Sequence, residues 1–185
     1  VPEFLTMLRG VIDSPDIPLN VSRSYLQSDG NVKKINSYIT KKVADKLTEL
    51  YKDDRKSYEE KWKDINLFVK YGMISEEKFY EKVEKIALLQ SLDNKMRTFE
   101  EYKKFVSKTQ KDKDKNTVIL YSNDAEKQES YIEDAKKRNY DVVLFDNVID
   151  SHYINHIEQK LDKVQIKRVD ADILDKLIDK DEKKE

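Results

Sequence analysis

The residues of this chain that are best suited to chemistry lie between positions 10 and 27, where an arginine follows a segment that contains two prolines. Pro15 and Pro18 fix their own φ angles and restrict the residue before each of them, so we expect the chain around them to be extended and rigid. The pattern then predicts a helix with Arg23 in its first turn and Gln27 one turn later on the same face. An arginine held on a rigid loop beside free backbone N–H groups is suited to binding a phosphate oxygen.

Spacing alone leaves other interpretations of these residues open. Arg23 is also compatible with an ordinary surface arginine, or with a structural ion pair to Asp13 or Asp16. A glutamine on an early helical turn usually faces water, and this applies to Gln27.

The same segment resembles the catalytic loop of the heat-shock protein 90 family of molecular chaperones, the bacterial HtpG type included. The resemblance is carried by GVIDS at positions 10–14, IPLNVSR at 17–23 and LQ at 26–27. It implies that the loop belongs to the middle domain of a chaperone. It further implies that Arg23 contacts the γ-phosphate of ATP bound by a separate N-terminal domain, with Gln27 as a helper.

The composition argues against several classes of protein. Charged residues make up 39% of the 185 positions, but 36 Lys and Arg nearly cancel 37 Asp and Glu, which argues against a dedicated nucleic-acid binder. There is no cysteine, no apolar run near the roughly 20 residues that span a membrane, and no segment typical of a signal peptide. We therefore expect a cytoplasmic protein without membrane contacts.

From position 31 onward the apolar residues follow helical spacing, and the breaks between helices are short, which predicts an antiparallel helical cluster. Ser57 with Glu60 and Thr98 with Glu101 have the spacing of capping boxes, and Ser75 precedes another predicted helix. The longest apolar stripe consists of Val32, Ile35, Ile39, Val43, Leu47 and Leu50.

After a charged linker at 111–115 the pattern changes to short apolar runs that alternate with helical segments. Residues 118–121 and 142–145 are typical of buried parallel strands, and the alternating residues 164–167 are typical of a strand at a sheet edge. Helices are predicted at 130–138, with Tyr131 and Ala135 facing inward, and at 150–161. The order β-α-β-α-β predicts three parallel strands.

The expected fold class is therefore α/β, with a catalytic loop and helical connector followed by a small three-layer α/β/α unit whose three-stranded sheet is mainly parallel. Residues 1–30 are expected to end a large middle subdomain, in which residues 11 and 12 form a short strand. Residues 31–110 are the helical connector, 116–170 the small subdomain, and 171–185 a C-terminal helix and charged tail. The order of these parts also resembles the family's middle domain.

Four other groups of residues are candidates for binding. His152 and His156 have a spacing that suits a metal, but solvated helix histidines are the better interpretation. The lysine pairs 33–34 and 41–42 are compatible with an acidic partner or a neighbouring domain, and more simply with a polar helix face. Trp62 is compatible with client binding or, more simply, with the core. The strand ends at 122–124 and 146–147 lack the glycine-rich loop of a phosphate site.

We therefore predict a fragment, without an initiator methionine, of an ATP-dependent chaperone that acts in the stress response and in protein folding. Its implied partners are the N-terminal ATP-binding domain of the same chain and unfolded client proteins. ATP, with magnesium, is expected to bind that other domain, so this fragment alone is expected to be inactive and monomeric although the parent is a homodimer. The alternative is a docking module without catalytic function, and an autonomous phosphate-handling enzyme ranks third.

Overall fold

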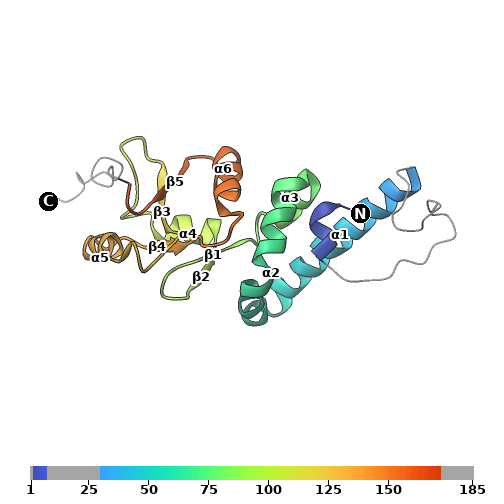
Figure 1. The fold of residues 1–185 in the computed structure, drawn as a ribbon, viewed down its shortest axis with the longest axis horizontal. Helices are drawn as coiled ribbons and strands as arrows, with labels where there is room; N and C mark the ends of the chain where they lie inside the picture. Colours follow the sequence, from blue (N-terminus) through green and yellow to red (C-terminus); the bar gives the residue numbers. More distant parts are fainter. Residues whose placement is uncertain (1, 8–29, 172–185) are drawn as a thin grey trace. The chain divides into compact units, whose positions relative to one another are not determined.

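A computed structural model describes residues 2–7 and 30–171 of the chain, which divides into two compact units, Val1–Ile86 and Ala87–Glu185. The first unit is helical and the second is α/β (Figure 1). The boundary falls inside the range 31–110 that the sequence suggests as a connector, because residues 87–110 join the α/β unit. The strand expected at positions 11–12 lies outside the described residues, and so does most of the C-terminal segment.

The helical unit is built from one short and three longer helical elements that pack against one another. Their order confirms the helical cluster predicted from the apolar spacing, and α2 begins only two residues after α1 ends. The elements are η1 (Glu3–Met7), α1 (Gly30–Asp53), α2 (Arg55–Ser75) and α3 (Glu77–Val83).

The start of α2 differs from the prediction. Asp54 is the N-cap residue, and its Oδ1 accepts a hydrogen bond from the Ser57 backbone N–H at 3.0 Å. The capping box predicted for Ser57 and Glu60 is wrong, because the nonhelical backbone of Asp54 interrupts the helix three residues earlier. An aspartate is as good a cap as a serine, so the earlier of two acceptable caps begins the helix.

Aromatic side chains form much of the core of the helical unit. Trp62 is 3% exposed and lies 5.9 Å from the ring of Tyr58, which supports its interpretation as a core residue. Tyr58 is fully buried, and its hydroxyl donates a hydrogen bond of 2.8 Å to the carbonyl oxygen of Ile86, the last residue of the unit. This bond fixes the point at which the chain leaves the helical unit.

The α/β unit contains the predicted three-stranded parallel sheet, in the order β4-β3-β5. The central strand β3 is almost entirely buried, and β5 lies at an edge, as its alternating sequence predicts. On α5, Ile132 and Ala135 face the core, whereas Tyr131 is 46% exposed, so the inward orientation predicted for Tyr131 is wrong. The elements are β3 (Thr117–Ser122), α5 (Glu129–Lys137), β4 (Val142–Leu144), α6 (Asp150–Lys160) and β5 (Val164–Arg168).

An antiparallel hairpin that the sequence does not predict opens this unit: β1 (Leu88–Gln90) pairs with β2 (Met96–Thr98) and leads into α4 (Phe99–Phe105). The predicted capping box at Thr98 and Glu101 is confirmed, since both of its hydrogen bonds are present. Ser91 at the end of β1 forms a bridge to Val143, which attaches the hairpin to β4.

Two buried polar side chains join the segment between α4 and β3 to the sheet. Gln110 is fully buried; its Nε2 donates to the Val118 carbonyl at 2.9 Å, and its Oε1 accepts from the Asp141 N–H at 2.6 Å. Asp112 accepts hydrogen bonds from the backbone N–H groups of Asp114 and Asn116, and from the Gln165 side chain. The segment predicted as a charged linker is therefore a turn organised around one buried carboxylate.

Replacing Tyr58 by phenylalanine is expected to lower the free energy of unfolding of the helical unit by about 1–2 kcal/mol. The substitution removes the hydroxyl and leaves the Ile86 carbonyl without this donor in a buried position. Denaturant unfolding followed by circular dichroism measures the change. Tyr38→Phe is the matched control in the same unit, because Tyr38 is 61% exposed and its replacement should change little; equal effects of the two substitutions would contradict the prediction.

Alkaline pH provides a second test of the same residue. Burial raises the pKa of Tyr58, so its contribution to stability is fully present below the pKa of an unfolded tyrosine, about 10, and is lost as the pH rises beyond it. Tyr58→Phe should therefore lose less stability than the wild type as the pH rises from about 10 to about 12. A parallel decline of the two proteins over this range would show that Tyr58 does not carry the effect.

Candidate functional site

The predicted site residues Arg23 and Gln27 lie outside the described residues, in the segment between η1 and α1. The structure does describe the elements that flank this segment on both sides. Both elements belong to the helical unit, where η1 packs against α2, and α1 packs against α2 and α3. The two ends of the predicted loop are therefore attached to one body.

The end formed by η1 is held by an aromatic cluster. Phe4 is fully buried, with its ring centroid 4.8 Å from that of Phe79 on α3 and 5.3 Å from that of Phe68 on α2. Leu5 beside it is 3% exposed. A hydrogen bond from the Tyr71 phenol to the Glu3 side chain adds a polar contact between η1 and α2, and it raises the pKa of Tyr71. A single short turn is thus fixed by contacts with two helices.

Gly72 makes this packing possible. A Cβ atom built at Gly72 would lie 2.7 Å from a ring carbon of Phe79 and 2.9 Å from a ring carbon of Phe4, closer than such atoms approach in real proteins. The missing side chain therefore leaves the space that the two rings fill. The sequence analysis did not identify Gly72 or its partners, because they lie far apart along the chain.

The end formed by α1 carries a basic pocket of about 530 Å³ between α1 and α3. Lys33 and Lys41 from the two predicted lysine pairs line it, and α3 contributes two further lysines that the sequence analysis did not single out. The full lining consists of Pro2, Lys33, Asn36, Ser37, Thr40, Lys41, Glu76, Lys78 and Lys82.

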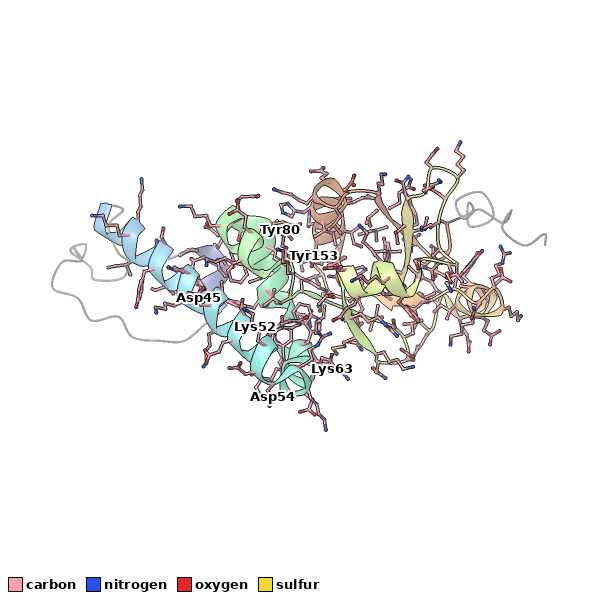
Figure 2. All side chains as sticks on the ribbon, turned by 180° about the vertical axis from the view of Figure 1, so that it is seen from behind. Asp45, Lys52, Asp54, Lys63, Tyr80 and Tyr153 are labelled. Carbon is pink, nitrogen blue, oxygen red and sulfur yellow. The ribbon has the colours of Figure 1, made fainter. Side chains whose placement is uncertain are left out.

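A second hollow of about 420 Å³ follows along α1 and shares Lys82 with the first. Its remaining lining includes the acidic residues Asp45, Glu49 and Asp53. Lys82 pairs with Asp45 at 3.2 Å, which joins α3 to α1 (Figure 2 shows Asp45 and Lys52 on this helix). The surface along α1 thus changes from basic to acidic toward its C-terminal end.

At the carboxyl ends of the strands, the polar side chains bind one another. The Gln128 side chain accepts from the Ser122 hydroxyl at 2.8 Å and donates to Asn123 and Asp170. Burial opposes ionisation of Asp170, but the adjacent Arg168 and Gln128 lower its pKa below the ordinary value. Ser122 and Asn123, which the sequence places at a possible ligand crevice, instead bind Gln128, and Gln128 also binds Asp170 after β5.

The two histidines of α6 do not form part of a metal site in the described residues. His152 is exposed and His156 is half-buried on α6, and within the described residues no three histidine or acidic side chains are grouped as metal ligands. The helices of the described part include none that is both long enough and apolar enough to cross a membrane.

Comparison with known proteins identifies the family. The whole chain, residues 1–185, matches the family described as Hsp90 protein. The chain belongs to the Hsp90 family. It is 55% identical over 184 residues to the chaperone protein HtpG of Bacteroides thetaiotaomicron, and 53% identical over 185 residues to that of Porphyromonas gingivalis. Each match covers 100% of this chain but only 27% of the relative, so this Hsp90-family chain spans a minor part of the length of these relatives.

A solved structure supports the fold. The middle domain of a Plasmodium falciparum heat shock protein superposes with a TM-score of 0.64 at 18% identity, covering 92% of this chain and 65% of that one. The family, the HtpG type and the middle-domain fold predicted from the sequence are thereby confirmed.

Gly72→Ala is expected to lower the free energy of unfolding of the helical unit by roughly 1–3 kcal/mol, the usual cost of overpacking a core. The added methyl group must displace the rings of Phe4 and Phe79. Gly30→Ala is the matched control, because a Cβ at Gly30 meets no atom within 4 Å. Thermal unfolding of the two variants measures the difference, and an unchanged midpoint for Gly72→Ala would contradict the packing described here.

Proposed function

We propose that this chain is the catalytic-loop part of an ATP-dependent chaperone and that Arg23 acts on the γ-phosphate of ATP bound by a separate N-terminal domain. The observation that carries the proposal is the match of residues 10–27 to the family's catalytic loop, within a chain that belongs to the Hsp90 family throughout. The anchoring of both flanking elements in one unit supports it, since a loop that delivers a charged group needs fixed ends.

The proposed mechanism is electrostatic. The guanidinium of Arg23 reaches the phosphate only when the two domains close, and it stabilises the negative charge that spreads over the transferred phosphoryl group. Gln27, one turn later on the same predicted face, orients Arg23 or the phosphate. Because the arginine arrives on closure, hydrolysis is coupled to the conformation of the chaperone, and the binding and release of client proteins follow that cycle.

Arg23→Ala in the full-length chaperone is expected to lower kcat for ATP hydrolysis by roughly ten- to a thousandfold while ATP binding is retained, because the interaction forms in the transition state. Turnover and nucleotide affinity are measured in parallel. Lys46→Ala serves as a control, since Lys46 is an exposed residue of α1 that pairs only with neighbouring Glu49 in the described contacts. Unchanged turnover in Arg23→Ala would refute the proposed role of the loop.

A second candidate function, protein docking without catalysis, is favoured by one specific observation. Four lysines converge on the pocket between α1 and α3, with Glu76 as the one acidic side chain in its lining. Such a surface attracts acidic groups at long range, and the attraction weakens as salt screens it. An acidic face of the N-terminal domain or of another protein is the partner that this charge fits.

The docking function predicts that Lys33→Glu with Lys41→Glu weakens association with the separately produced N-terminal domain by roughly tenfold or more at low salt, with a smaller difference at high salt. Titration calorimetry at two salt concentrations measures this. Lys61→Glu with Lys63→Glu, on α2, reverses the same amount of charge outside the pocket and is the control. Equal effects of the two pairs would indicate a response to net charge and exclude this pocket as the docking site.

Several wider properties are proposed on the same basis. The parent protein is a cytoplasmic homodimer of the stress response, and ATP with magnesium binds its N-terminal domain. The four-part division at residues 1–30, 31–110, 116–170 and 171–185 is retained as a hypothesis about family subdomains, alongside the two compact units that the structure contains.

A further inference from the structure

We propose that Glu158 closes the outer edge of β5, and that this edge pairs with the β5 edge of a second copy of the chain when the carboxylate of Glu158 is removed. The proposal concerns the α/β unit alone and does not depend on the proposed function of Arg23. It assigns to Glu158 a role beyond its long ion pair with Lys167, in which the two charged atoms lie 3.9 Å apart.

The first step in the argument is that the two edges of the parallel sheet are covered differently. The hairpin covers the β4 edge with backbone, since Ser91 forms an antiparallel bridge with Val143 and the Leu92 N–H donates to the Val142 carbonyl at 3.0 Å. β5 forms the other edge, and no strand of the described residues pairs with its outer side. An unpaired strand edge is a site at which another strand can be added.

The second step is the register of β5, which determines the backbone groups that the edge presents. At one end the Thr117 N–H donates to the Lys163 carbonyl at 2.8 Å. At the other end the Val169 N–H donates to the Tyr121 carbonyl at 2.8 Å, so the odd-numbered residues face β3. The N–H and C=O groups of the even-numbered residues of β5 therefore point outward. These residues are Val164, Ile166 and Arg168.

The third step is that Glu158 binds the central one of these outward groups. Glu158 lies on α6, which packs against β5 (Figure 1), and its Oε1 accepts a hydrogen bond from the Ile166 N–H at 2.9 Å. The carboxylate thus binds the N–H group that the carbonyl of an added strand would need. A charged acceptor binds an N–H more strongly than a neutral carbonyl does, so an incoming strand would lose more at this position than it gains.

The fourth step is that a second β5 strand fits this edge. With Ile166 opposite its own counterpart in an antiparallel pair, the outward residues of the two strands exchange hydrogen bonds symmetrically. In this register Lys167 lies opposite Gln165. Arg168 lies opposite Val164, so no cation of one strand directly faces a cation of the other.

The test replaces Glu158 in the 185-residue chain and measures self-association by sedimentation equilibrium. Glu158→Ala is expected to lower the dissociation constant of self-association by roughly tenfold or more, because the Ile166 N–H no longer has to leave a carboxylate before it pairs. Glu158→Gln keeps an oxygen that can accept this N–H, so it is expected to associate less than Glu158→Ala.

Glu133→Ala is the matched control, because it removes the same charge from an exposed position on α5. It is expected to associate no more than the wild type. If Glu158→Ala also associates no more than Glu133→Ala, the proposal is overturned.

Amide hydrogen exchange identifies the surface through which the copies associate. In Glu158→Ala, the amides of Val164, Ile166 and Arg168 are expected to become protected as the protein concentration rises. Association that leaves these amides unprotected would overturn the proposal, because the copies would then meet at another surface. Protection that appears only when an unrelated extended peptide is added would overturn the choice of a second copy as the partner.

A second substitution separates strand pairing from association caused by loss of stability. Arg168→Pro removes an outward N–H and places a proline ring at the edge, while the hydrogen bonds between β5 and β3 are kept. Glu158→Ala with Arg168→Pro is therefore expected to return to the monomer, with circular dichroism verifying that each variant is folded. A folded double variant that associates as strongly as Glu158→Ala would contradict the proposal.

Discussion

The contact on which the helical unit most depends is the approach of two phenylalanine rings to a glycine that has no side chain. Phe4 and Phe79 fill the space beside Gly72, and Phe68 completes the cluster. This contact joins η1 to both α2 and α3. Without it, a turn of five residues would have few means of remaining in place beside three longer helices, because short helices gain little from their own hydrogen bonds.

In the α/β unit, buried polar side chains help to hold the chain segments together. Its strands β4 and β5 are short, and buried polar side chains between α4 and β3 add hydrogen bonds to the sheet. Gln110 satisfies one backbone carbonyl and one backbone N–H in positions closed to water, and Asp112 accepts several bonds in its turn. Removing such a side chain leaves several buried groups unpaired, which makes these residues costly to replace.

The charged residues of the described part occur both in exposed ion pairs and around a concave surface. The ion pairs Lys46–Glu49 and Lys104–Glu100 lie on exposed helix faces, where each contributes little. The pocket between α1 and α3 differs, because four lysines from two helices surround one concave surface, and of these Lys82 also pairs with Asp45. Like charges gathered in this way oppose folding slightly, so the arrangement is better explained by a partner than by stability.

Local patterns in the sequence were enough to predict the helices of the first unit, the three parallel strands, the cap at Thr98 and the family. These features depend on periodicity, on neighbouring residues or on a contiguous motif, all of which are visible along one chain. The hairpin β1–β2 was missed because Leu88 and Leu89 follow the apolar residues Ile86 and Ala87 without a break, and because its bridge from Ser91 to Val143 joins residues far apart in the sequence.

Only the tertiary structure decided the contacts between residues that are far apart in sequence. The partners of Gly72 are 68 positions before it and 7 after it, and the lysines of the pocket come from two helices about 40 residues apart; neither arrangement leaves a periodic signal. Arg23 differs from these residues, because its motif is visible in the sequence. Its proposed target belongs to another domain. The sequence by itself therefore determined the local elements and the family, and packing alone determined which residues hold the ends of the loop in place.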